Sequence, residues 1–159
     1  MFAIGDKIVY PMHGAGIIEG LIEEEVDGIK HTYYEMMLPV GNLKIKISSL
    51  KVEKLGLRQV CDKDQVIQII QNVKVQPMPE NWTQRYKENL EKIKSGNLWE
   101  VALVFRNLMY REKQRGLSSA EKKMLTKAKQ IIVSEIALSQ NVEKCKAEEI
   151  LASSNMQYN

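Results

Sequence analysis

The first third of the chain alternates between hydrophobic and polar residues over short runs, a pattern typical of half-buried strands. Leu43 to Ile47 alternates strictly, so this predicted strand has one apolar face and one cationic face. Asp27-Gly28 is a typical hairpin turn between two such runs. The predicted strands span residues 8–10, 17–26, 30–38 and 43–47. Four or five short strands joined by tight turns indicate a small antiparallel β-barrel over residues 1–55.

From residue 62 onwards the apolar residues recur every three or four positions, which is the period of amphipathic helices. Before most of these segments stands a polar residue that can accept hydrogen bonds from the amides of a first helical turn: Asp62, Asn81, Asn97 and Ser118. Ser118 and Glu121 together form a capping-box pattern. The predicted helices run from 62 to 72, 82 to 94, 98 to 115, 118 to about 138 and 142 to about 152, with a frayed tail at 153–159.

These two patterns predict an α+β protein with two domains. The first is a β module over residues 1–55, and the second is a helical bundle over residues 62–159. The boundary lies near residues 55–61, and no long flexible linker separates the halves. We therefore expect the two domains to sit in a defined relation.

One helix is predicted to begin with a large aromatic side chain. The prolines Pro77 and Pro79 disfavour helix immediately upstream, because each fixes φ and lacks an N–H group. Asn81 is a natural cap, so Trp82 falls in the first helical turn, with little structure before it to cover the ring. An aromatic ring that can insert, beside cations that can hold phosphates, is suited to gripping deformed nucleic acid.

Charge is distributed unevenly between the halves. Residues 1–60 contain 7 Lys and Arg against 8 Asp and Glu, whereas residues 82–129 contain 12 against 5. Such a concentration favours an anionic partner for the second half, since summed fields attract opposite charge. On charge alone, lysines that only solvate the helices are an equally good interpretation.

The sequence contains few residues suited to catalysis or metal binding. Cys61 and Cys145 lie far apart without ligand spacing, which favours reduced, buried thiols. His13 and His31 have no nucleophile or carboxylate patterned around them, and no glycine-rich phosphate loop is present. We therefore expect no enzyme activity, no metal and no cofactor.

The sequence also favours a protein that stays inside the cell and off the membrane. No apolar run approaches the roughly 18–20 residues that span a bilayer. The first residues lack a basic region followed by a long apolar one, so they do not form a signal peptide. A cytoplasmic protein, expected to be monomeric, is the simplest interpretation.

Three motifs resemble the CarD family of bacterial transcription regulators. They are Val9-Tyr10-Pro11-Met12-His13-Gly14-Ala15-Gly16, the run from Asn81 to Leu90, and the run from Arg115 to Leu125. The first motif is shared with the polymerase-interacting domain of transcription-repair coupling factor. That protein has motor domains in place of the helical half, so the CarD family is the closer match.

This resemblance implies a non-enzymatic accessory factor of RNA polymerase. In such proteins an N-terminal Tudor-like β module binds the β subunit of the polymerase. The helical domain contacts promoter DNA, largely independently of sequence, at the upstream edge of the melted region. A tryptophan, matched here by Trp82, wedges into the minor groove and stabilises the open promoter complex.

Candidate site residues follow from the resemblance together with the predicted faces. The candidate DNA contacts are Trp82, Arg85, Lys87, Lys94, Lys122 and Lys123. The candidate polymerase contacts are Lys44, Lys46, Glu24 and Val26. Two positions depart from the family: Gln84 stands where relatives often have a basic residue, and the acidic run at 23–25 lies in an arm that can be basic.

Two alternatives stay open from the sequence. Trp82 is followed by apolar residues at helical spacing, so it could simply begin a core stripe, or pack one edge and expose the other. The helical half could also bind a polypeptide and never contact DNA, which would make the protein a protein–protein adaptor. Substitution of Trp82 separates these alternatives.

Overall fold

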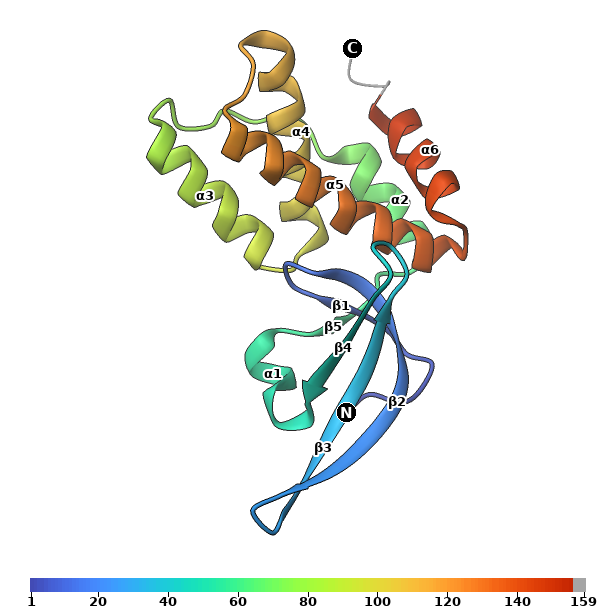
Figure 1. Ribbon diagram of the computed structural model, residues 1–159. Helices are drawn as coiled ribbons and strands as arrows, with labels where there is room; N and C mark the ends of the chain where they lie inside the picture. Colours follow the sequence, from blue (N-terminus) through green and yellow to red (C-terminus); the bar gives the residue numbers. More distant parts are fainter. Residues whose placement is uncertain (156–159) are drawn as a thin grey trace.

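The computed structural model describes residues 1–155 and consists of a twisted β-sheet beneath a layer of helices (Figure 1). The strands are β1 (Lys7–Tyr10), β2 (Gly14–Val26), β3 (Ile29–Leu38), β4 (Leu43–Ser48) and β5 (Arg58–Gln59). A 3₁₀ turn, η1 (Ser49–Lys51), and the short α1 (Val52–Leu55) lie between β4 and β5. The remaining helices are α2 (Lys63–Asn72), α3 (Trp82–Lys94), α4 (Leu98–Gln114), α5 (Ser119–Gln140) and α6 (Lys144–Asn155). The predicted fold class, a Tudor-like antiparallel β module followed by helices, is confirmed.

The sheet has the order β4-β3-β2-β1-β5 with antiparallel neighbours throughout. β2 and β3 form a long hairpin that extends away from the helices (Figure 1). β2 begins at Gly14, three residues earlier than predicted, because the preceding turn falls at Met12, whose φ is 74°. Gly16 lies inside this strand. Glycine is required there because a Cβ would come within 2.5 Å of the Met37 carbonyl oxygen on β3.

Alternating side chains give the sheet a core of its own. Ile8, Ile18, Met36 and Ile47 come from four strands and are almost fully buried together. Toward the hairpin tip, β2 alternates between exposed and half-buried residues, as expected for a sheet with one face toward solvent. The strands form a five-stranded sheet with its own small apolar cluster, and the pairing recorded among residues 1–155 does not close it into the predicted barrel.

The helix caps fall where the sequence predicts them. The side chains of Asp62, Asn81, Asn97 and Ser118 each accept a hydrogen bond from the backbone amide three residues ahead. Helix α6 continues to Asn155, so residues 153–155 are helical rather than frayed, and residues 156–159 lie outside the described part. None of the described helices is both long and apolar enough to cross a bilayer.

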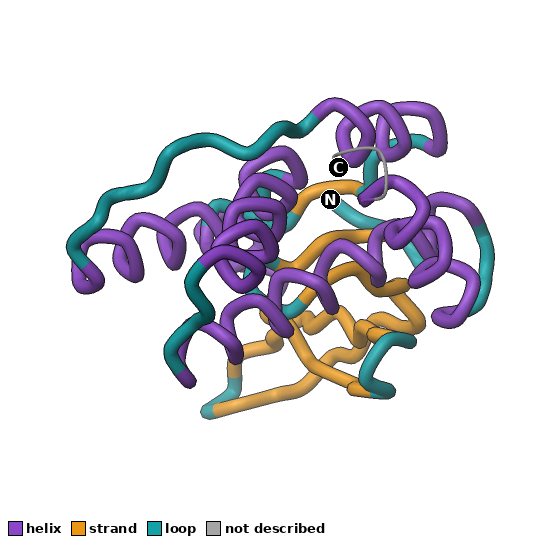
Figure 2. The backbone as a smooth tube through the Cα atoms, turned by 90° about the horizontal axis from the view of Figure 1, so that it is seen from above, coloured by secondary structure: helices purple, strands orange, loops and turns teal. Residues whose placement is uncertain are grey.

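α4 and α5 form the centre of the helical half. Their buried residues include Val104, Leu108, Ile132 and Ile136, and the other helices pack around this pair (Figure 2). This cluster is larger than that of the sheet. The loop from 73 to 81 crosses in extended form from α2 to the start of α3 (Figure 2).

The two halves are joined by direct contacts. Val9 and Ala15 of the sheet pack against Leu138 of α5, and the amide of Ala15 donates to Ser134 Oγ over 2.8 Å. Arg58 of β5 donates to both carboxylate oxygens of Glu135, over 2.7 and 2.9 Å. The expected defined relation between the halves therefore has a physical basis. β5 itself lies within the stretch that the sequence treats as a boundary.

Candidate nucleic-acid interface

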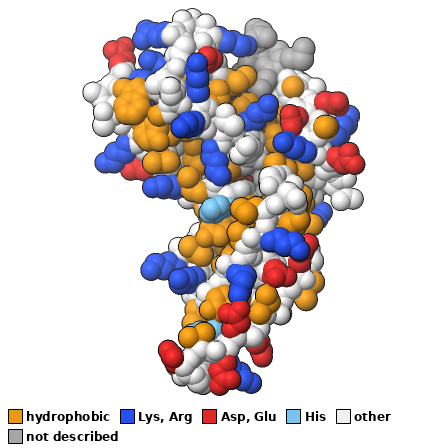
Figure 3. Space-filling view, in the orientation of Figure 1, with side chains coloured by type: hydrophobic (Ala, Val, Ile, Leu, Met, Phe, Trp, Pro, Cys, Tyr) orange, Lys and Arg blue, Asp and Glu red, His pale blue; other side chains and the backbone are white. Residues whose placement is uncertain are grey.

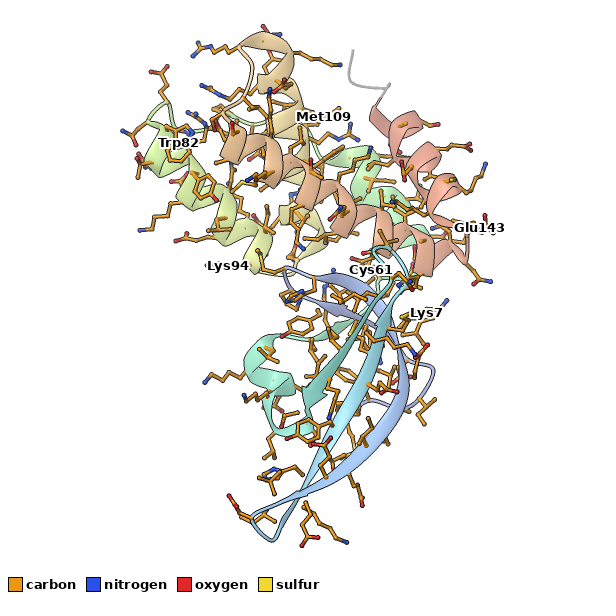
Figure 4. All side chains as sticks on the ribbon, in the orientation of Figure 1. Lys7, Cys61, Trp82, Lys94, Met109 and Glu143 are labelled. Carbon is orange, nitrogen blue, oxygen red and sulfur yellow. The ribbon has the colours of Figure 1, made fainter. Side chains whose placement is uncertain are left out.

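Trp82 lies at the outer end of α3, far from the sheet, whereas Lys94 lies at the end nearest the sheet (Figure 4). Asn81 Oδ1 accepts from the amide of Gln84 over 2.9 Å, which starts the helix at Trp82. The residues before it form an extended, proline-containing segment. This geometry leaves the indole ring 41% exposed.

The indole ring is supported on two sides. Its plane stacks on the Tyr86 ring, with centroids 5.1 Å apart and planes 15° apart. Its Nε1–H donates to Ser118 Oγ at the start of α5 over 3.1 Å. Below it, Tyr86 and Leu90 are partly buried and Ile93 is fully buried, so the apolar stripe enters the core only beyond Trp82. Trp82 therefore packs on one side and remains accessible on the other.

Exposed lysines lie along the helix that carries this ring and near the start of the neighbouring helix α5. Lys87 and Lys94 are exposed on α3, seven residues and therefore about two turns apart. Lys122 and Lys123 are exposed in the first turn of α5. Figure 3 shows Lys and Arg side chains around an apolar patch over the helical half. Four of the six predicted DNA-contact residues are thus exposed lysines, of which Lys94 lies at the opposite end of α3 from Trp82.

Arg85 is a correction to the predicted DNA contacts. Its side chain is 2% exposed and pairs with the equally buried Glu121 of α5 through Nε, over 2.8 Å. Its Nη1 donates to the carbonyls of Glu80 and Pro79, over 2.9 and 3.3 Å. A guanidinium held in this way cannot reach a phosphate without breaking a buried ion pair.

Glu121 also departs from the predicted capping box. Its carboxylate accepts from the Ser118 hydroxyl and from Arg85 rather than reaching back to a backbone amide. Burial alone would raise the pKa of Glu121, but the bonds from Arg85 and Ser118 outweigh burial and lower the pKa below its ordinary value. The carboxylate is therefore ionised and fixed at the junction of α3 and α5.

The predicted polymerase contacts lie on the hairpin and the edge strand. Lys46 Nζ forms a hydrogen-bonded ion pair with Glu24, which raises the pKa of Lys46, and it lies 5.1 Å from the Tyr33 ring centroid. Lys44 pairs with Glu19 over 3.6 Å. Val26 is 47% exposed near the hairpin tip. These residues share one surface, and the acidic arm is partly neutralised by the lysines of β4.

The thiols and histidines do not form a catalytic arrangement. Burial raises the pKa of Cys61 to about 11, so its thiol is protonated at neutral pH. Cys145 is exposed, which contradicts the expectation that both thiols are buried. His13 packs edge-on against Tyr10, and burial together with the charge of Lys127 lowers its pKa. Within residues 1–155 no group of three potential metal ligands is found.

Sequence reasoning missed three features near the interface. The contact between Trp82 and Ser118 joins residues 36 positions apart, and no local pattern signals it. Trp99 and Tyr110 of α4 are also exposed, at 40% and 53%. A cavity of about 590 Å³ lies between the loop at 75–80 and the end of α4, lined in part by Arg111 and Arg115.

Comparison with known proteins covers both halves. Residues 2–61 match the CarD-like/TRCF RID domain, and residues 65–152 match the C-terminal domain of CarD. The chain is 39% identical over 145 residues to "Putative transcription factor YdeB" of Bacillus subtilis (strain 168), covering 89% of this chain and 94% of that protein. It is also similar to the solution NMR structure of the 72-residue N-terminal domain of Myxococcus xanthus CarD, with 29% identity, 37% of this chain and 79% of that one covered, and a TM-score of 0.32. Family models that together span most of the chain, and a relative matched along nearly its whole length, show that this protein belongs to the CarD family of transcription factors.

Proposed function

We propose that this protein regulates transcription, without catalysing a reaction, by holding RNA polymerase and promoter DNA together at the melted region. The β module, residues 1–55, binds the β subunit of the polymerase. The helical domain, residues 62–159, contacts the DNA, and Trp82 wedges into the minor groove at the upstream edge of the bubble. Filling the groove there slows the collapse of the open complex.

The accessible indole ring of Trp82 is the observation that carries this proposal. Trp82 is 41% exposed, so its ring can stack on a base, while the exposed Lys87, Lys94, Lys122 and Lys123 supply charge for phosphates along α3 and at the start of α5. Unstacking a base step costs a few kcal/mol, which the wedge and the phosphate contacts must offset. Phosphate contacts position a protein without reading sequence, so a general effect on promoters is expected.

The polymerase side rests on the hairpin and the edge of the sheet. Among the described strands β4 pairs only with β3, so its other edge can pair with a strand of the polymerase through main-chain groups. Lys44 and Lys46 lie on this strand, and Glu24 and Val26 lie on β2, the next strand beyond β3. Main-chain pairing tolerates changes of side chain, which accommodates the acidic arm of this protein.

Replacing Trp82 with alanine tests the proposal. Trp99→Ala is a matched control, because Trp99 is a tryptophan of nearly equal exposure on the neighbouring helix. We expect W82A to shorten the lifetime of the open complex by about tenfold, equivalent to about 1.4 kcal/mol, with polymerase affinity unchanged. The lifetime is measured by challenging preformed open complexes with a competitor, and the affinity by titration of polymerase. Equal lifetimes for W82A and wild type would favour an adaptor that does not touch DNA.

A further inference from the structure

The hydroxyl of Ser118 makes three hydrogen bonds beside the indole ring of Trp82. It accepts from the Glu121 amide over 3.2 Å and from Trp82 Nε1 over 3.1 Å. It donates its own proton to Glu121 Oε1 over 3.1 Å. A serine hydroxyl has one proton and two lone pairs, so its bonding capacity is fully used. Its orientation is consequently determined by its three partners.

Two of these three bonds are made with Glu121, which belongs to a buried frame together with Arg85. Glu121 and Arg85 are both 2% exposed, and the ion pair between them ties α5 to α3. The same guanidinium binds the carbonyls of Pro79 and Glu80 in the loop before Trp82. The frame therefore holds the helix start, the preceding loop and the cap of α5 in one arrangement, with the Ser118 hydroxyl at its outer edge.

This frame determines which part of the indole ring is available. Tyr86 covers one ring face, and Ser118 holds the edge that carries the N–H group. The remainder of the residue stays accessible, since Trp82 is 41% exposed. A tryptophan in an exposed first turn would otherwise sample several side-chain conformations, and selecting one of them on insertion would cost free energy.

We propose that Ser118 is a positioning residue that holds the Trp82 ring in its inserting orientation before DNA arrives. This inference rests on the proposed wedge function of Trp82 and adds the residue that prepares the wedge. Glu121 and Arg85 support it by directing the Ser118 proton inward, so that a lone pair faces the indole N–H group. The ring then loses less conformational freedom when it enters the groove.

A purely structural role as a helix cap must be separated from this one. Glycine is nearly as good a cap as serine, costing only a few tenths of a kcal/mol, but it has no hydroxyl for the indole. Ser118→Gly therefore removes the contact with Trp82 and largely keeps the helix start. Ser118→Thr restores a hydroxyl at the same position. Asn97→Gly is the matched control. The Asn97 side chain caps α4 by accepting from the Glu100 amide of the same helix.

The experiment measures the ring and the promoter complex separately. In a Trp99→Phe background Trp82 is the single tryptophan, so the decay of fluorescence anisotropy reports the local motion of its ring. For S118G we expect faster ring motion and an open-complex lifetime shortened by about threefold to tenfold, the range expected for one lost hydrogen bond. S118T recovers both values, and N97G changes neither. In a W82A background S118G has no further effect on lifetime.

Different failures have different meanings. An S118G variant with wild-type ring motion and wild-type lifetime, beside a short-lived W82A complex, would overturn the positioning role and leave the wedge intact. An S118G effect of the same size in the W82A background would overturn it too, because Ser118 would then act on the fold. A W82A variant with wild-type lifetime would overturn the proposed function and, with it, the role of Ser118 in promoter binding.

Discussion

Arg85 and Lys87 lie two residues apart on α3 and have opposite surroundings. Both are cations beside Trp82 in the sequence, and both were predicted to contact DNA. Arg85 is buried against Glu121, whereas Lys87 is exposed. The spacing of residues along one helix cannot show this difference, because it depends on which flank of α3 packs against α5.

Replacing each of these cations with alanine separates fold from binding. Arg85→Ala leaves the Glu121 carboxylate buried without its partner, so we expect a loss of about 3–5 kcal/mol in the free energy of unfolding. Lys87→Ala removes an exposed cation and should change stability by less than about 0.5 kcal/mol. Urea denaturation followed by tryptophan fluorescence measures both. An R85A protein as stable as wild type would contradict the structural role of this ion pair.

At the scale of the elements, local signals predicted the helices well and the strands less completely. The caps of α2 to α5 depend on side chains within three residues of each helix start, so the sequence contains the whole signal. β5 has only two residues, and they form a strand because they pair with Ile8 and Val9 of β1. No local sequence pattern predicts that pairing. The start of β2 was missed because Gly14 and Gly16 resemble a turn.

Gly14 and Gly16 of β2 instead allow close packing against neighbouring elements. A Cβ at Gly16 would meet the Met37 carbonyl oxygen at 2.5 Å, whereas one at Gly20 in the same strand would meet nothing closer than 3.5 Å. We expect Gly16→Ala to lower the free energy of unfolding by about 1–3 kcal/mol, the usual cost of overpacking. Gly20→Ala is the control and should have little effect. Chemical denaturation measures both, and equal stability of the two variants would show that β2 and β3 can separate without cost.

At the scale of the whole molecule, the halves share an apolar cluster and a partly buried ion pair. Arg58 binds Glu135 through both Nη atoms and also donates to the Gly96 carbonyl over 2.7 Å. Glu135 in turn accepts from the Cys61 amide. These contacts join three separate parts of the chain, around residues 58–61, 96 and 135. The sequence predicts a defined relation between the halves only from the absence of a linker. It gives no local signal for the contacts of Arg58 and Glu135 that join them.

Breaking this ion pair tests whether the halves unfold together. We expect one endotherm for the wild-type protein by calorimetry. Arg58→Ala leaves Glu135 unpaired and should cost about 2–4 kcal/mol, less than a fully buried pair because Arg58 is partly solvated. It should also divide unfolding into two transitions. Lys146→Ala removes an exposed ion pair within α6 and serves as the control. A single endotherm for R58A at the wild-type melting temperature would contradict coupling through this pair.

The ion pairs of the hairpin have a consequence for how the two proposed partners would respond to ionic strength. Lys44 and Lys46 already have carboxylates beside them, so these two lysines present little net positive charge to a partner. Within residues 1–155, Lys87, Lys94, Lys122 and Lys123 form no ion pair, and displacing counterions from DNA makes such contacts weaken steeply as salt is added. Rising salt should thus detach the protein from the promoter while it is still bound to the polymerase, leaving the enzyme loaded with a regulator that has released its DNA.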